Sequence, residues 1–195
     1  MLAELWTQFS QQSPWEALAV ALGIAYVILA ARESIWCWPA AFISTAIYTA
    51  LFWQGQLPMQ SLLNLFYLGM AMYGFMLWRR HDRPQDDLKI HFWAWRNHLA
   101  FIAIGTVLTL SMGLLLTELQ ASQKPYLDAF VTVFSVLNTY LMARKVLENW
   151  AYWLVIDSAA VVLYLQTGYL MTAAMFALYL GLAVYGLINW LKLYH

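Results

Sequence analysis

The chain alternates between long apolar runs and short polar segments. Each run is continuous, and a helix that crosses a hydrocarbon core of about 30 Å needs about 20 mostly apolar residues. Continuous runs do not fit the alternating pattern of a membrane β-barrel. The pattern therefore predicts an all-α integral membrane protein with seven transmembrane helices, at Trp15–Ala31, Trp36–Trp53, Met59–Trp78, Leu99–Thr117, Tyr126–Ala143, Asn149–Gln166 and Tyr169–Leu191.

Composition supports a membrane protein and excludes several other classes. Of the 195 residues, 63% are hydrophobic and only 10% are charged, whereas soluble domains are about half apolar and a quarter charged. Cys37 is the only cysteine, so no disulfide framework exists. The formal net charge is zero, so no bulk field attracts nucleic acid. A cytosolic enzyme, a secreted scaffold and a disordered chain are excluded.

The distribution of basic residues predicts the orientation. If the N-terminus lies outside, nine Lys and Arg residues fall on the inner side and Lys124 alone falls outside. Because cytoplasmic loops carry an excess of Lys and Arg, the N-terminus is predicted outside and the C-terminus in the cytoplasm. The N-terminal segment MLAELWTQFSQQSPW lacks the basic region of a signal peptide. The inner set is Arg32, Arg79, Arg80, Arg83, Lys89, Arg96, Arg144, Lys145 and Lys192.

The longest polar stretch, Arg79–His98, joins the third and fourth runs. Its histidines, His81, His91 and His98, match no zinc spacing, which favours a solvated basic loop without a metal. No histidine is expected at membrane depth to act as a base, so no enzyme and no cofactor are predicted. The end of the stretch is expected to lie at the lipid headgroups. Its interfacial residues are Trp93, Trp95 and Arg96.

The chain contains an internal repeat. One constant shift of the chain against itself superposes Arg32 on Arg144, Trp38 on Trp150, Tyr67 on Tyr179, Gly69 on Gly181, Tyr73 on Tyr185, Gly74 on Gly186 and Trp78 on Trp190. Gly55 and Gly168 match when the shift is lengthened by a single position. The repeat predicts one transmembrane domain of two parallel three-helix repeats, about 15–78 and 126–191, with a linker helix at about 99–117. Parallel repeats with substrate between them are a recurring transporter plan, although shared ancestry alone would also leave such a repeat.

Two acidic residues fall inside the predicted spans. Asp157 lies about 12 Å along the sixth span, close to the midplane, where charges are rare and usually functional. Asp128 lies near the outer end of the fifth span, where it could bind ligand or cap the helix. Asp157 is therefore the stronger candidate for a binding residue.

Trp150, Trp153 and Asp157 share one helical stripe, because they are spaced by three and four residues. Indole faces beside a carboxylate form a receptor for a flat, cationic organic molecule. The alternative is an interfacial Trp150 and a packing Trp153. Asn64 and Asn138 could face the same pocket or join helices. Trp38, the repeat counterpart of Trp150, completes the candidate substrate-binding residues.

The segment RKVLENWAYWLVID, the following QTGYL and the Tyr-Gly-x-x-x-Trp ends resemble the PnuC family of bacterial vitamin transporters, whose motif in the sixth span is W-x-x-W-x-x-x-N/D. The resemblance covers Trp15 to Trp190. It implies a three-plus-one-plus-three plan like that of SWEET sugar carriers, a homotrimer in the bacterial inner membrane, and facilitated diffusion with trapping by a cytoplasmic kinase.

The resemblance also implies site residues and a ligand. Trp150, Trp153 and Asp157 occupy the motif, Asn64 the place of a pocket Gln, and Asp128 that of an acid in the fifth span. Nicotinamide riboside carriers of the family have Asn where this chain has Asp157. An ionised Asp only accepts hydrogen bonds, which suits the amine of thiamine. The expected ligand is thiamine, as in the PnuT subgroup, with nicotinamide riboside as the alternative and a non-transporting receptor as the alternative class.

Overall fold

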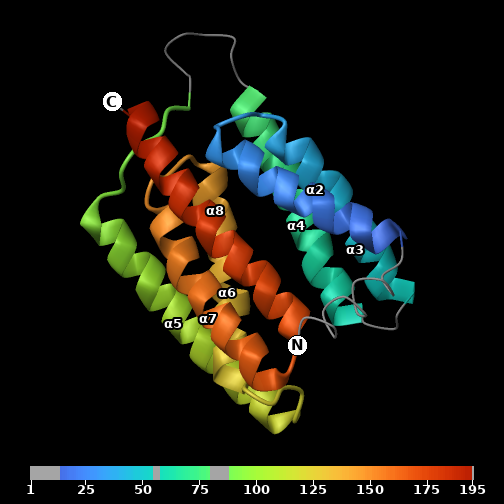
Figure 1. The fold of residues 1–195 in the computed structure, drawn as a ribbon. Helices are drawn as coiled ribbons and strands as arrows, with labels where there is room; N and C mark the ends of the chain where they lie inside the picture. The colour runs from blue at the N-terminus through green and yellow to red at the C-terminus, as the bar shows by residue number, and fades with distance from the viewer. Residues whose placement is uncertain (1–13, 55–57, 80–87, 195) are drawn as a thin grey trace. The chain divides into compact units, whose positions relative to one another are not determined.

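The computed structural model describes residues 14–54, 58–79 and 88–194. Seven helices are found in these ranges, and the seven predicted runs are confirmed to within four residues at each end. The largest difference is at Trp95, where the fourth helix begins before its apolar run does. The helices are α2 (Pro14–Ala31), α3 (Cys37–Gln54), α4 (Pro58–Arg79), α5 (Trp95–Glu118), α6 (Pro125–Ala143), α7 (Asn149–Thr167) and α8 (Leu170–Tyr194) (Figure 1).

Five of the described helices are both long and apolar enough to cross a membrane: α2, α4, α5, α6 and α8. The remaining two, α3 and α7, have 18 and 19 residues and so have the length, but their mean hydropathy is lower, because each combines Trp and Tyr with several polar side chains. These two helices occupy equivalent places in the sequence repeat, each being the second helix of its copy. The protein is a multi-pass membrane protein whose less apolar helices correspond to each other.

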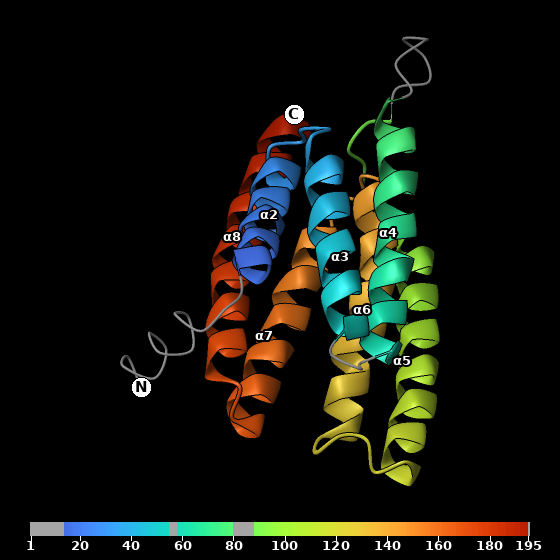
Figure 2. The same cartoon turned by 90° about the vertical axis from the view of Figure 1, so that its right-hand side faces the viewer.

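The chain divides into two compact units, residues 1–89 and 90–195. In the first unit, α2 and α4 both pack against α3. In the second unit, α5 packs against α6, α6 against α7, and α7 against α8 (Figures 1 and 2). The main apolar core of the second unit lies among α5, α6 and α7, where Phe101, Phe134 and Ile156 are buried.

The turns that end α2 and α6 have the same backbone geometry. Glu33 and Lys145, which are equivalent positions of the repeat, have positive φ angles of 56° and 55°. In each turn, carbonyl oxygens in the last turn of the helix accept the two hydrogen bonds of a Schellman motif. The matched bonds, N–H to C=O at 2.9–3.0 Å, are Glu33 to Ala30 and Ser34 to Leu29 in one turn, and Lys145 to Met142 and Val146 to Leu141 in the other.

Each unit also contains the same arrangement of two indoles and one glycine, which we call the tryptophan–glycine clamp. In each clamp the first Trp lies against a glycine where a Cβ atom would overlap its ring. The second Trp meets the first edge-on, with ring centroids 5.5 Å apart in the first unit and 5.6 Å apart in the second. The clamps are Trp38, Gly74 and Trp78, and Trp150, Gly186 and Trp190.

Some sequence-based expectations concern residues outside the described ranges. They are the absence of a signal peptide in residues 1–13, the repeat match of Gly55, and the inner placement of Arg80, His81 and Arg83.

Candidate ligand-binding site on helix α7

Asp157 lies in the middle of α7 and is 3% exposed. No described residue forms a hydrogen bond or an ion pair with its carboxyl group. Burial of an acid without a protein partner is costly, because the charge loses its hydration. Asp157 therefore lacks the compensation that a purely structural buried acid has, and it is suited to bind a ligand or a proton.

Two residues of the expected stripe on α7, Trp150 and Asp157, are buried, and the two indoles of the stripe differ in exposure. Trp150 is 1% exposed, and its ring is enclosed by Gly186 and Trp190 of the clamp. Trp153 is half-buried and packs against the edge of the core. Within the second unit, the Trp153 ring retains surface that a ligand could contact, whereas the Trp150 ring is used in packing.

Asn138 joins α6 to the start of α7. Its Nδ2 donates to the carbonyl oxygen of Asn149 at 2.9 Å, and the side chain is fully buried. The Oδ1 atom of Asn138 and the Nε1 atom of Trp150 have no hydrogen-bond partner among the described residues. Asn138 therefore joins α6 to α7 through its Nδ2 atom, and its Oδ1 atom could accept a further hydrogen bond.

Asp128 lies in the first turn of α6 and is partly exposed. The N-terminus of α6 has no side-chain capping hydrogen bond, so Asp128 does not cap it in that way. An acid in a first turn is still favoured by the helix dipole. Asp128 and Asn138 are about 15 Å apart along α6, at 1.5 Å per residue, so they lie at different depths.

The other two candidates, Trp38 and Asn64, belong to the first unit. Trp38 is buried in its clamp, and its Nε1 atom has no partner among the described residues. Asn64 lies on α4 and is half-buried. The remaining five candidates belong to the second unit, where Asn138, Trp150 and Asp157 are all buried.

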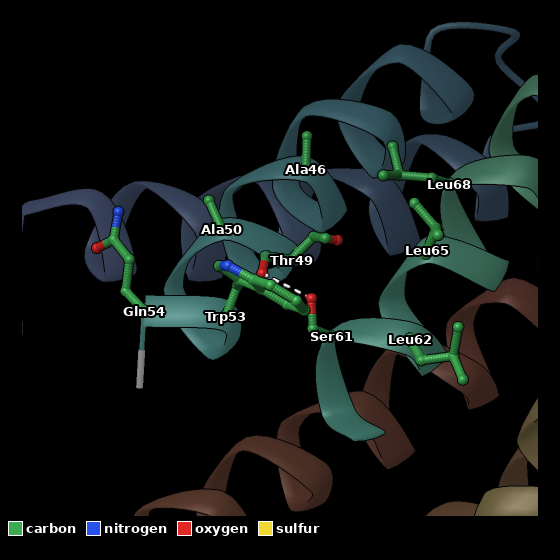
Figure 3. A pocket seen from close by; sticks show the side chains of 9 residues that line it. All are labelled: Ala46, Thr49, Ala50, Trp53, Gln54, Ser61, Leu62, Leu65 and Leu68. Atoms are coloured by element: carbon green, nitrogen blue, oxygen red, sulfur yellow. Dashed lines mark hydrogen bonds between the residues drawn. The ribbon is translucent and has the colours of Figure 1, made fainter. Parts of the chain in front are cut away.

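The first unit has an open pocket of about 650 Å³ between α3 and α4 (Figure 3). Ser61 donates a hydrogen bond across it to the carbonyl oxygen of Thr49 at 3.0 Å. Its described lining has no charged residue and none of the candidate site residues, so it has no group to balance a cationic ligand. The lining residues are Ala46, Thr49, Ala50, Trp53, Gln54, Ser61, Leu62, Leu65 and Leu68.

The structure differs from the expected solvated loop at Ile90–Trp93 and at His98, whereas Trp95 and Arg96 are exposed. His91 pairs with the α6–α7 turn in a parallel β-bridge: its N–H donates to the Lys145 carbonyl at 3.2 Å, and its own carbonyl accepts from Leu147 at 2.9 Å. Trp93 packs against Phe101, so its ring serves the protein core and not the headgroups. We call residues 90–93 the strap.

A polar cluster at the N-terminal end of α7 was missed by the sequence analysis. His98 lies in the first turn of α5, not in a loop, and contacts Glu148 and Tyr152. Glu148, two residues before the first Trp of the W-x-x-W motif, was the available signal, since an acid at the edge of a span usually has a partner. Among the described residues, no group of three His, Cys, Asp or Glu side chains could hold a metal ion.

Comparison with known proteins agrees with this architecture. Residues 13–192 match the family model described as nicotinamide mononucleotide transporter. The riboflavin/roseoflavin transporter RibM of Streptomyces davaonensis is 28% identical, over 96% of this chain and 90% of the relative. The nicotinamide riboside transporter PnuC of Escherichia coli is 26% identical, over 78% of this chain and 74% of the relative.

A solved structure is similar as well. The crystal structure of the vitamin B3 transporter PnuC matches 99% of this chain and 87% of its own, with a TM-score of 0.75 and 26% identity. The class defined by fold and site is a multi-pass membrane protein with a buried acid inside a helix. The chain belongs to the nicotinamide mononucleotide transporter family, the membrane vitamin transporters of the PnuC type, which confirms the family resemblance.

Proposed function

We propose that the protein carries a small cationic vitamin, thiamine as the first candidate, across the bacterial inner membrane. The observation that carries this proposal is the buried carboxyl group of Asp157, which has no described partner and shares a helical face with the half-buried Trp153. A carboxylate balances a cationic ring and accepts hydrogen bonds from an exocyclic amine, while an indole stacks on the ring. Thiamine offers both groups.

Nicotinamide riboside is the second candidate, because relatives that carry this name match most of the chain. It is also a cation, so the charge of Asp157 alone does not separate it from thiamine. Its carboxamide both donates and accepts, which an Asn satisfies better than an Asp. The name of the RibM relative adds riboflavin, a neutral flat ring, as the comparison ligand for a test.

The proposed mechanism is facilitated diffusion, with the vitamin trapped by phosphorylation in the cytoplasm. The N-terminus lies outside and the C-terminus inside, as the basic residues predict. We assign residues 15–78 and 126–191 to two parallel repeats in a SWEET-like three-plus-one-plus-three plan, with α5 as the linker helix and a homotrimer as the assembly. The matched clamps of the two units support this plan.

The site residues are assigned different roles. Trp153 and Asp157 contact the ligand, and Trp150 holds the face of α7 against α8. Asn138, Asp128, Asn64 and Trp38 are proposed as further pocket residues. Asn138 and Trp38 have the strongest support among these four, because the buried Oδ1 atom of Asn138 and the buried Nε1 atom of Trp38 have no partner among the described residues.

Ligand titration of the purified protein tests this function. We expect thiamine to bind, and Asp157→Ala to weaken its binding by about 10- to 100-fold, since a hydrogen bond to a charged group contributes about 1.5–3 kcal/mol. Ser158→Ala is the matched control, because this neighbouring hydroxyl is exposed and bonds to its own helix at Leu154. Binding of nicotinamide riboside or riboflavin without thiamine would refute the choice of ligand.

Counterflow of labelled thiamine in sealed vesicles tests the mechanism. Exchange without an ion gradient is expected for facilitated diffusion. Exchange that requires a pH gradient would instead indicate proton coupling through Asp157. Binding without any exchange would favour a receptor.

A further inference from the structure

The cluster at the N-terminal end of α7 links three segments of the second unit through one carboxylate. The backbone N–H of Trp93 on the strap donates to both carboxylate oxygens of Glu148, at 3.2 and 3.3 Å. His98 Nε2 on α5 lies 3.1 Å from Glu148 Oε1. His98 Nδ1 lies 2.8 Å from the hydroxyl of Tyr152 on α7. The strap, α5 and α7 therefore meet at these side chains.

The hydrogen-bond roles follow from the chemistry of the groups. A carboxylate only accepts, so Nε2 of His98 donates to Glu148. In the neutral ring Nδ1 then accepts, and the Tyr152 hydroxyl donates to it. Each polar atom of the cluster has a partner in this arrangement. Such satisfied networks fix one geometry, because any displacement leaves a polar group unpaired.

Glu148 is in the position to cap α7 but does not do so. It is the N-cap residue, and its side chain makes no capping bond. A capping acid commonly contributes about 1 kcal/mol to its own helix. Its carboxylate is directed instead to the strap and His98, with the side chains of His98 and Glu148 each 22% exposed. The position is thus used to orient α7 relative to α5.

Orientation of α7 decides where the candidate site faces. Tyr152 directly precedes Trp153. Asp157 lies on the same helix, about one and a half turns after Tyr152. Tyr152 holds the rotation of the helix through His98, and Glu148 holds its end. A rotation of α7 by one residue would turn Trp153 and Asp157 by about 100°.

We propose that Glu148, His98 and Tyr152 form a positioning cluster that fixes the rotation of α7 and so directs Trp153 and Asp157 toward the ligand. The expected effect of this cluster on ligand binding rests on the proposed function. The structural part of the proposal, the fixed rotation of α7, is independent of which ligand binds. If only a fraction of molecules has α7 in the competent rotation, apparent affinity falls by that fraction.

Spin labels test the structural part without any ligand. Labels are attached at Val107→Cys on α5 and Ser158→Cys on α7, both exposed, after Cys37→Ser removes the only native cysteine. We expect a narrow distance distribution in the otherwise unaltered protein and a broad one in His98→Ala. An unchanged distribution in His98→Ala would overturn the proposal, whatever the ligand.

Titration with thiamine, nicotinamide riboside and riboflavin tests the consequence. Tyr152→Phe is expected to weaken binding about 5-fold, as for loss of one net hydrogen bond, with folding retained. His98→Gln, whose amide can reach Glu148, and His98→Asn, whose amide can reach Tyr152, should each bind better than His98→Ala. Tyr169→Phe, the same change at an exposed tyrosine after the C-terminal end of α7, should leave affinity unchanged.

Two outcomes separate this proposal from the proposed function. Lower thermal stability of the cluster variants with unchanged affinity would mean a purely structural role and would overturn the positioning cluster. Failure of the native protein to bind any of the three vitamins would refute the proposed function, while the distance distributions would still decide whether the cluster positions α7.

Discussion

The two copies of the sequence repeat have the same scaffold but different chemistry. In each copy, the turn after the first helix has a residue with a positive φ angle, Glu33 or Lys145, and both copies have a tryptophan–glycine clamp. At the position of Asp157, however, the first repeat has Thr45, and at the position of Trp153 it has Ala41. The elements that hold the helices together are therefore duplicated, whereas the buried acid occurs in one copy.

The beginnings of the second helices differ in the same way. Glu148, which anchors the strap and His98, corresponds to the exposed Trp36 in the first repeat. Asn138 and Asn149, joined by a hydrogen bond, correspond to Tyr26 and Cys37. Polar side chains that the first repeat does not have at these positions therefore lie beside the helix that carries the candidate site.

The largest effect on stability is expected at the glycines of the clamps. Gly74→Ala and Gly186→Ala place a Cβ atom inside the space of an indole ring. Each should lower the free energy of unfolding by up to about 3 kcal/mol, as overpacking does. Thermal unfolding in detergent measures this effect.

The repeat provides matched controls for the clamp substitutions. Gly69 and Gly181 are equivalent to each other, and a Cβ atom at either position meets nothing within 4 Å. Their substitution by Ala should leave stability unchanged or raise it slightly. A large loss at Gly74 with none at Gly186 would mean that the two clamps are not equivalent.

A smaller effect is expected at Asn138, where the repeats differ. Asn138→Ala removes the bond to the Asn149 carbonyl and should cost about 1 kcal/mol of stability. Thr139→Ala is the neighbouring control, because its hydroxyl donates to the Ser135 carbonyl of its own helix and, among the described residues, does not join α6 to α7. Equal losses of stability for both variants in thermal unfolding would show that the hydrogen bond between α6 and α7 contributes no more than a bond within one helix.

The smallest effect is expected in the turns. Glu33→Gly and Lys145→Gly relieve the left-handed backbone, and each should have a free energy of unfolding about 0.5 kcal/mol above that of the matching Ala variant, which loses the same side chain, after the entropy of the new glycine is subtracted. Arg144→Gly, at a residue with φ of −82°, should instead have a lower free energy of unfolding than its matching Ala variant. Chemical denaturation that gives the same sign at Lys145 and Arg144 would contradict the backbone argument.

The sequence predicts much of the fold for a clear physical reason. Membrane helices must be apolar over a fixed length, so their positions are visible as runs. The rare residues of the repeat, such as Trp150 and Gly186, identify equivalent positions without any structure. The family motif likewise identifies α7 as the helix of interest.

The remaining features depend on tertiary contacts that no local pattern reveals. A tryptophan on a helical stripe can face a pocket or a glycine, and Trp150 faces Gly186 because α8 packs there. The strap pairs His91 with Val146, which lies two helices further along the chain, and the polar composition of this segment resembles that of a solvated loop. Helix α5 begins at Trp95, before its apolar run, and His98 in this first turn contacts Glu148 and Tyr152.

The central claim is that Asp157, in one repeat alone, recognises the ligand. The most direct measurement compares thiamine affinity, by calorimetric titration, in Asp157→Thr and in Thr45→Val, its counterpart in the first repeat. We predict at least about a tenfold loss for Asp157→Thr, as for a bond to a charged group, and no change for Thr45→Val. Equal losses in the two variants, or an unchanged affinity in Asp157→Thr, would contradict the claim.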